Sequence, residues 1–263
     1  MLSPLYGQLS PLRVPTKAVR KISDDADANA YLLAVEQYDG QELELGVIAA
    51  LESFVVGCKS DGIWSAIKAS CILVGARTLD GALVPLVGVA PTNNNFVSAD
   101  YNRETGLIGN GSTKFLNTNR IDNSDPQDNH HFSVFVETLP TGGGTYGGTI
   151  SGQTNINTGT TSTNGRCRSI TSLSLGGFTK AFKGIARDSS LIIRGRANNQ
   201  NYSNTNITST LPVNANKFIF ARAAGDIKCN GRISFYSIGE SLDLAKLDTR
   251  VSTLMTALAA AIP

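Results

Sequence analysis

The chain has 263 residues, of which 41% are hydrophobic, and its formal net charge at pH 7 is only +2. This length and composition allow a substantial core, either in one large all-β domain with additions or in two small domains. Because the Lys and Arg residues are spread along the sequence, no basic surface for nucleic acid is expected. No run approaches 18 consecutive apolar residues, so membrane insertion is not expected either.

The first six residues lack a basic region followed by an apolar one, so we expect no secretory signal and synthesis in a cytosol. The four cysteines form no Cys-x-x-Cys pair, and in a reducing compartment we expect them to be buried free thiols. They are Cys58, Cys71, Cys167 and Cys229.

Residues 1–22 are expected to form an extended N-terminal arm. Its three prolines oppose helix and interior strand. Its large apolar side chains need a surface on which to be buried, on the chain's own domain or on a neighbour. We interpret the arm as an assembly element, with a frayed terminus as the alternative. These apolar residues are Leu2, Leu5, Leu9, Leu12 and Val14.

Residues 23–71 are expected to form a helical lead-in domain. The segment begins with aspartates that suit a helix N-terminus. Helical periodicity then predicts three helices, of which the first ends at Gly40 and the second near Gly57. The expected buried faces are Tyr31, Ala34, Val35 and Tyr38 in the first, Val47, Ile48, Leu51, Phe54 and Val55 in the second, and Trp64, Ile67 and Cys71 in the third.

From residue 72 the hydrophobic period changes from 3.6 to 2. Apolar residues alternate with others in short runs such as 132–136 and 173–175. Turn signals separate these runs, so residues 72–240 are predicted to form a sandwich or barrel of antiparallel strands. The Asn-Gly turn signals are Asn110-Gly111, Asn164-Gly165 and Asn230-Gly231.

Residues 241–263 are expected to form a C-terminal helix that begins at an N-cap, Ser241. Five apolar residues repeat with the spacing of a heptad seam, over a run too short to predict a coiled coil. Packing against the sandwich is the favoured interpretation, and an assembly contact around an oligomer axis is the alternative. The seam consists of Leu244, Leu247, Val251, Leu254 and Leu258.

Several stretches resemble phage proteins. The run Tyr101–Leu116, with Gly-Leu-Ile-Gly-Asn-Gly-Ser-Thr-Lys-Phe-Leu, resembles the entry strands of phage LamG-like, concanavalin A-like domains. Residues 119–131 are similar to the loop and strand that follow in those proteins, and 235–242 to their closing strand and terminal helix. The block 54–71 is similar to the lead-in domain of structural proteins of tailed phages, including cyanophages.

The resemblance covers residues 27–260 and implies a mainly β fold, a concanavalin A-like antiparallel β-sandwich (jelly roll). It also implies a virion structural protein, made in the host cytoplasm, and leaves open a place in the tail, fibre, neck or capsid. By resemblance to phage fibre and decoration proteins we expect a homo-oligomer, a trimer, that contacts other virion proteins through the arm.

No catalytic residues are expected. Glucanases with this sandwich carry an E-x-D-x-x-E strand, which is absent, and the strand at 131–138 carries only Glu137. His130 and His131 should point to opposite faces of that strand, one ring packed and one exposed, and cannot share a metal.

A loop with alternating acidic residues is a weak calcium candidate, because hard oxygen donors suit that ion. Asx turns around Pro126 explain the same residues without a metal, so no cofactor is expected. The three carboxylates are Asp122, Asp125 and Asp128.

Exposed aromatic rings and amides in Gly- and Asn-rich loops are candidates for binding glycan, with ordinary polar turns as the alternative. They are Tyr146, Asn198, Asn199, Asn201, Tyr202 and Asn204. The sequence thus predicts a virion structural component that displays a lectin-like sandwich, with host-surface polysaccharide as a candidate ligand. The alternatives are a receptor-recognition lectin and a glycan depolymerase.

Overall fold

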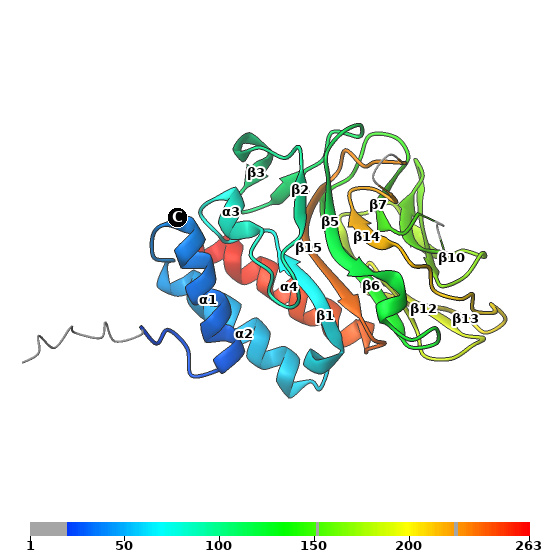
Figure 1. Cartoon of the computed structure of the whole chain (residues 1–263), viewed down its shortest axis with the longest axis horizontal. Helices are drawn as coiled ribbons and strands as arrows, with labels where there is room; N and C mark the ends of the chain where they lie inside the picture. Colours follow the sequence, from blue (N-terminus) through cyan, green and yellow to red (C-terminus); the bar gives the residue numbers. More distant parts are fainter. Residues whose placement is uncertain (1–19, 151–152, 224–225) are drawn as a thin grey trace, which may run out of the picture.

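The computed structural model describes residues 20–150, 153–223 and 226–263. The chain forms three layers, with helices on one face of an eight-stranded antiparallel sheet (sheet A) and a seven-stranded antiparallel sheet (sheet B) on the other (Figure 1). This sandwich, with helices at the start and the end, confirms the expected mainly β fold class. The arm residues Leu2, Leu5, Leu9, Leu12 and Val14 lie outside the described residues.

Sheet A is the central layer. In spatial order its strands are β13 (Gln200–Asn204), β12 (Ile193–Ala197), β11 (Ala181–Arg187), β6 (His130–Thr138), β15 (Arg232–Gly239), β4 (Gly106–Ile108) and β3 (Tyr101–Asn102), and β1 (Ile67–Ile72) also pairs with β15. Sheet B consists of β10 (Leu173–Gly177), β9 (Ser162–Cys167), β8 (Thr154–Thr158), β7 (Gly144–Gly148), β14 (Asn216–Ile219), β5 (Phe115–Ile121) and β2 (Thr92–Asn94).

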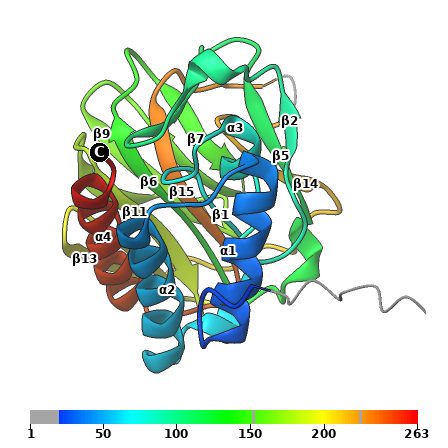
Figure 2. The ribbon, with the colours of Figure 1, turned by 90° about the vertical axis from the view of Figure 1, so that its left-hand side faces the viewer.

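The helical layer consists of α1 (Ala26–Asp39), α2 (Leu45–Ser60) and α4 (Leu244–Ala261), and a short helix, α3 (Leu79–Ala82), lies near α1 (Figure 2). Asp25 caps α1, and Gly40 ends it with φ +69°, a conformation that glycine adopts without strain. The cap of α4 is Asp243 and not Ser241, because the Asp243 carboxylate accepts from the backbone N–H of Ala245 and Lys246. None of the helices in the described segments has the length and hydrophobicity that a membrane crossing requires.

The core between the two sheets follows from the alternation that the sequence predicts. Phe132, Val134 and Val136 of β6 are buried against sheet B. The Asn164-Gly165 pair lies inside β9 and not in a turn, so that prediction is wrong. Gly165 is required there because a Cβ atom would collide with the Ile185 side chain of the facing sheet.

A second core lies between sheet A and the helices. Phe135, Phe182 and Phe235 of the sheet are buried there with residues of α2 and α4. The five seam residues of α4 are part of this core, which confirms that the helix packs on the sandwich. They are therefore not available for the alternative assembly contact, and that interpretation is wrong for Leu244, Leu247, Val251, Leu254 and Leu258.

Two local predictions in the helical block are wrong. The third helix is reduced to a single 3-10 turn, Trp64–Ala66, because Ile67–Ile72 is β1, in which Cys71 pairs with Tyr236 of β15. Both faces of this strand are largely buried, so its apolar residues do not show the period of 2 that marks a half-exposed strand. Tyr38, expected on the buried face of α1, is 63% exposed. All four cysteines are buried and free, as predicted.

Replacing a seam residue tests the helical layer. Leu247 is fully buried, so Leu247→Ala is expected to lower the free energy of unfolding by about 2–5 kcal/mol. Urea denaturation followed by circular dichroism measures this change. Thr256→Ala, on the exposed face of the same helix, is the control and should change stability by less than about 0.5 kcal/mol. Equal effects of the two substitutions would contradict the packing of α4.

Candidate functional site

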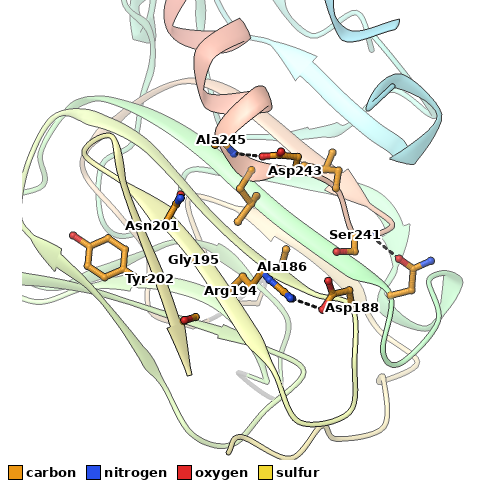
Figure 3. Close-up of a pocket in the computed structure, with 13 residues that line it drawn as sticks. Ala186, Asp188, Arg194, Gly195, Asn201, Tyr202, Ser241, Asp243 and Ala245 are labelled. Carbon is orange, nitrogen blue, oxygen red and sulfur yellow. Dashed lines mark hydrogen bonds and ion pairs between the residues drawn. The ribbon is translucent and has the colours of Figure 1, made fainter. Parts of the chain in front are cut away.

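A pocket of about 710 Å³ opens beside the start of α4, on the face of sheet A that carries the helices (Figure 3). Its floor is a row of three paired residues, in which Ala186 of β11 lies opposite Arg194 of β12 and Arg194 lies opposite Ser203 of β13. Residues 241–245 form the wall. The floor is thus built from strands, which hold their side chains more rigidly than loops do, whereas Asp188 and residues 241–243 lie in connections between elements.

Polar side chains dominate the lining. Arg194 forms an ion pair with Asp188, and both side chains are about half exposed, so they remain accessible to a ligand. The Asn129 amide oxygen accepts from the backbone N–H of Ser241 at 2.7 Å and ties the β6 end to the wall. Such a mixture of donors and acceptors suits a hydroxyl-rich ligand.

Arg196 lies two residues after Arg194 on β12 and joins the floor to the wall. Its Nε donates to Asp248 of α4 at 2.8 Å, and its other nitrogens donate to Asn199 and Asn201. These three hydrogen bonds of one buried guanidinium fix α4 relative to the β12–β13 hairpin, and therefore the width of the pocket.

The structure separates the predicted glycan-binding residues. Asn201 and Tyr202 line the pocket, but the Tyr202 ring points away from it (Figure 3) and its hydroxyl lies against Gly176 of β10. Tyr146 was expected in an exposed loop, and this is wrong, because it lies in β7 and is fully buried between the sheets.

The remaining predicted residues shape the hairpins around the pocket. Asn198 and Asn199 have φ of +53° and +63° and form the tight turn between β12 and β13. The Asn204 side chain accepts from the backbone N–H of Asn206. These contacts correspond to the alternative of ordinary polar turns.

Sequence reasoning missed most of the lining, because the residues come from separate parts of the chain. Asp188 looked like one acidic turn residue among several, and Arg194 had no motif around it. The one available signal was the alternation of β12, which places Arg194 and Arg196 on the same face. The missed polar residues are Asn129, Asp188, Arg194, Ser203, Ser241 and Asp243.

Two of the three calcium candidates, Asp122 and Asp125, belong to a buried ionic cluster. The Lys217 ammonium lies 2.7 Å from the Asp122 carboxylate, and Arg120 pairs with Asp125. Burial raises the pKa of Asp125, but hydrogen bonds from His130 and Arg120 outweigh it and hold that pKa well below its usual range. Cations of the protein therefore lie where a calcium ion would sit between Asp122 and Asp125. Asp128 carries no ion pair in the described segments.

Both histidines are fully buried, so the expectation that one ring is exposed is wrong. His130 Nδ1 donates to the Gly239 carbonyl at 2.8 Å, and His131 Nδ1 donates to the Glu240 carbonyl at 2.5 Å. Burial lowers the pKa of His130 to about 3 and that of His131 to about 4. β6 is covered on both faces, which explains why neither ring reaches solvent.

No family model matches this sequence, and no curated protein matches it. Among solved structures, Trypanosoma rangeli sialidase in complex with 2,3-difluoro-KDN is similar with a TM-score of 0.50 and 11% identity, covering 80% of this chain and 39% of the sialidase. The botulinum neurotoxin serotype D binding domain is similar with a TM-score of 0.48 and 12% identity, covering 72% of this chain and 51% of the neurotoxin chain. The CBM40 of Ruminococcus gnavus IT-sialidase, bound to α2,3 sialyllactose, is similar with a TM-score of 0.36 and 10% identity. The match covers 48% of this chain and 83% of the CBM40.

The chain spans about half the length of the neurotoxin chain and less of the sialidase. At such low identity, the likeness concerns the fold alone. It agrees with a concanavalin A-like β-sandwich, the fold implied by the resemblance of residues 101–116.

The buried histidines make stability depend on pH. The unfolded side chains titrate near 6.5, and the folded ones near 3 and 4. Between pH 6.5 and about 4 the unfolded state therefore binds more protons than the folded state does. The contribution of the histidines to the free energy of unfolding is fully present above pH 6.5 and is lost as the pH falls. Each histidine should contribute a slope of up to about 1.4 kcal/mol per pH unit.

Urea denaturation between pH 4.5 and 6.5 measures this slope. His131→Gln should remove about half of it, whereas Asp24→Asn, at an exposed carboxylate, should leave it unchanged. An unchanged slope in His131→Gln would show that His131 does not titrate as the structure requires.

Proposed function

We propose that this chain is a carbohydrate-binding structural protein of a tailed-phage particle. In this proposal, the pocket beside α4 contacts hydroxyl-rich host-surface polysaccharide, and the N-terminal arm attaches the sandwich to other virion proteins. The observation that carries the binding part is the row of Arg194 and Ser203 with Asp188, which offers accessible donors and acceptors on one rigid face.

The lining supports binding rather than hydrolysis. It contains two carboxylates, of which Asp188 pairs with Arg194 and Asp243 caps α4. A glycosidase needs one carboxyl kept protonated and a second one free to act as nucleophile or base. The lining residues that the structure describes also include no His or Cys. These features favour a protein that holds glycan without cleaving it.

A glycan array of neutral and acidic bacterial polysaccharides tests the binding. The wild-type protein is expected to bind at least one polymer, and Arg194→Ala should weaken that binding about ten- to hundredfold, because the variant loses charged hydrogen bonds. Both side chains of the Asp188–Arg194 pair are half exposed, so their replacement should leave the fold intact.

Arg166→Ala is the matched control, since Arg166 lies on β9 of the opposite sheet, where its Nε donates to Ser172. It should bind as the wild type does. Equal binding by Arg194→Ala would contradict the pocket, and reducing ends released from the bound polymer would favour the alternative of a depolymerase.

The virion part rests on the resemblance of residues 101–116 and 54–71 to phage structural proteins and on the apolar arm at 1–22. Deleting residues 1–22 is expected to leave a folded protein, because all the fully buried residues of the two described cores lie beyond the arm, which contributes only the partly buried Ile22. The truncated protein should no longer join particles, which mass spectrometry of purified virions measures.

Incorporation of the truncated protein at the wild-type level would show that the arm is not the attachment element. Absence of the full-length chain from purified particles would contradict the virion role itself, whatever the glycan array shows.

A further inference from the structure

Lys183 of β11 is buried completely inside the sandwich. Its neighbours Phe182 and Gly184 face the helices, since Phe182 belongs to the helical core and a Cβ atom on Gly184 would lie 2.9 Å from Leu244. The alternation of the strand therefore turns Lys183 toward sheet B. Its paired residues on both sides, Val134 and Ala197, are apolar and belong to the core between the sheets.

The Lys183 ammonium has no counter-charge. All 21 Asp and Glu residues of the chain lie in the described segments, and none of them forms an ion pair with Lys183. Its Nζ is also without a hydrogen-bond partner among the described residues. Lys217, which is also fully buried, contrasts with it, because its Nζ lies 2.7 Å from Asp122.

Two neighbouring contacts between the sheets indicate which residue faces Lys183. Arg187 Nε donates to the Cys167 carbonyl at 2.8 Å, and Ile185 lies against Gly165. These two pairs are two residues apart on both β11 and β9. The next pair, two residues further along each strand, places Lys183 opposite Thr163 of β9. Thr163 pairs with Thr158 of β8.

A further polar group at this place lacks a partner. The Thr163 hydroxyl is buried without a hydrogen bond in the described structure. The Tyr146 hydroxyl, at the same end of the core, instead interacts with Thr158, the residue that pairs with Thr163. Lys183 therefore faces a second unpartnered donor, Thr163, and no carboxylate pairs with either group.

We propose that Lys183 and Thr163 bind a small inorganic anion, of the size of chloride, between the two sheets. An anion accepts hydrogen bonds from both groups and neutralises the ammonium, whereas a water molecule supplies no charge. Burial lowers the pKa of Lys183 to about 8, so the side chain is still largely cationic at pH 7. The buried site is separate from the proposed glycan pocket, which faces the helices.

Thermal unfolding at pH 7 and constant ionic strength tests the proposal, with sodium chloride exchanged for sodium gluconate, whose anion is too large to enter. Chloride at ten times its dissociation constant shifts the folded-to-unfolded ratio about elevenfold and should raise Tm by about 3–6 °C. Lys183→Met should abolish this chloride effect without lowering Tm in gluconate. Thr163→Val, which removes one donor, should weaken it.

Lys21→Met, at an exposed lysine, is the control and should keep the full effect. Crystals grown in sodium bromide give a direct readout, with an anomalous peak expected beside Lys183 Nζ. A Tm that does not distinguish chloride from gluconate, an equal chloride effect in Lys183→Met, or water without bromide at Nζ would overturn the proposal.

Discussion

On β6, Phe132 packs against sheet B and Phe135, three residues later, packs against the helices, so this one strand contributes to two cores. Its neighbour β15 does the same through Phe235 and Tyr236. Because both faces of these strands are removed from water, a polar group on them is costly unless it finds a partner inside the protein. This constraint explains why both histidines of β6 are buried and bonded to backbone carbonyls.

The same constraint separates the buried charges into two kinds. Asp122 and Asp125 are compensated by Lys217 and Arg120, and this network ties the loop before β6 to β5 and β14. Removing one partner of such a buried pair strongly destabilises the folded state, because the other charge is then left buried and unpaired. Lys183 has no such partner in the described segments, although it is buried as deeply. The described chain alone therefore leaves the charge of Lys183 uncompensated.

The sequence predicted the parts of the fold whose periodicity is simple. The period of 2 in residues 132–136 and the heptad spacing of α4 both identified buried faces correctly. β1 could not be recognised, because a strand buried on both faces is apolar at adjacent positions and resembles a helix. Tyr146 could not be placed either, since glycines around a tyrosine suggest a loop, whereas here they allow β7 to lie close to the facing sheet.

The pocket lies where the coverage of sheet A by helices ends. Along β11, Phe182 packs under the helices, Gly184 lets Leu244 approach closely, and Ala186 already lines the pocket. Beyond this point the same face of the sheet is open to solvent, so β12 and β13 can carry Arg194 and Ser203 there without a desolvation penalty. Sequence alone could not locate this boundary, because it depends on how α4 lies across the sheet. The position of the helix, and not a local motif, thus determines which polar residues face a ligand.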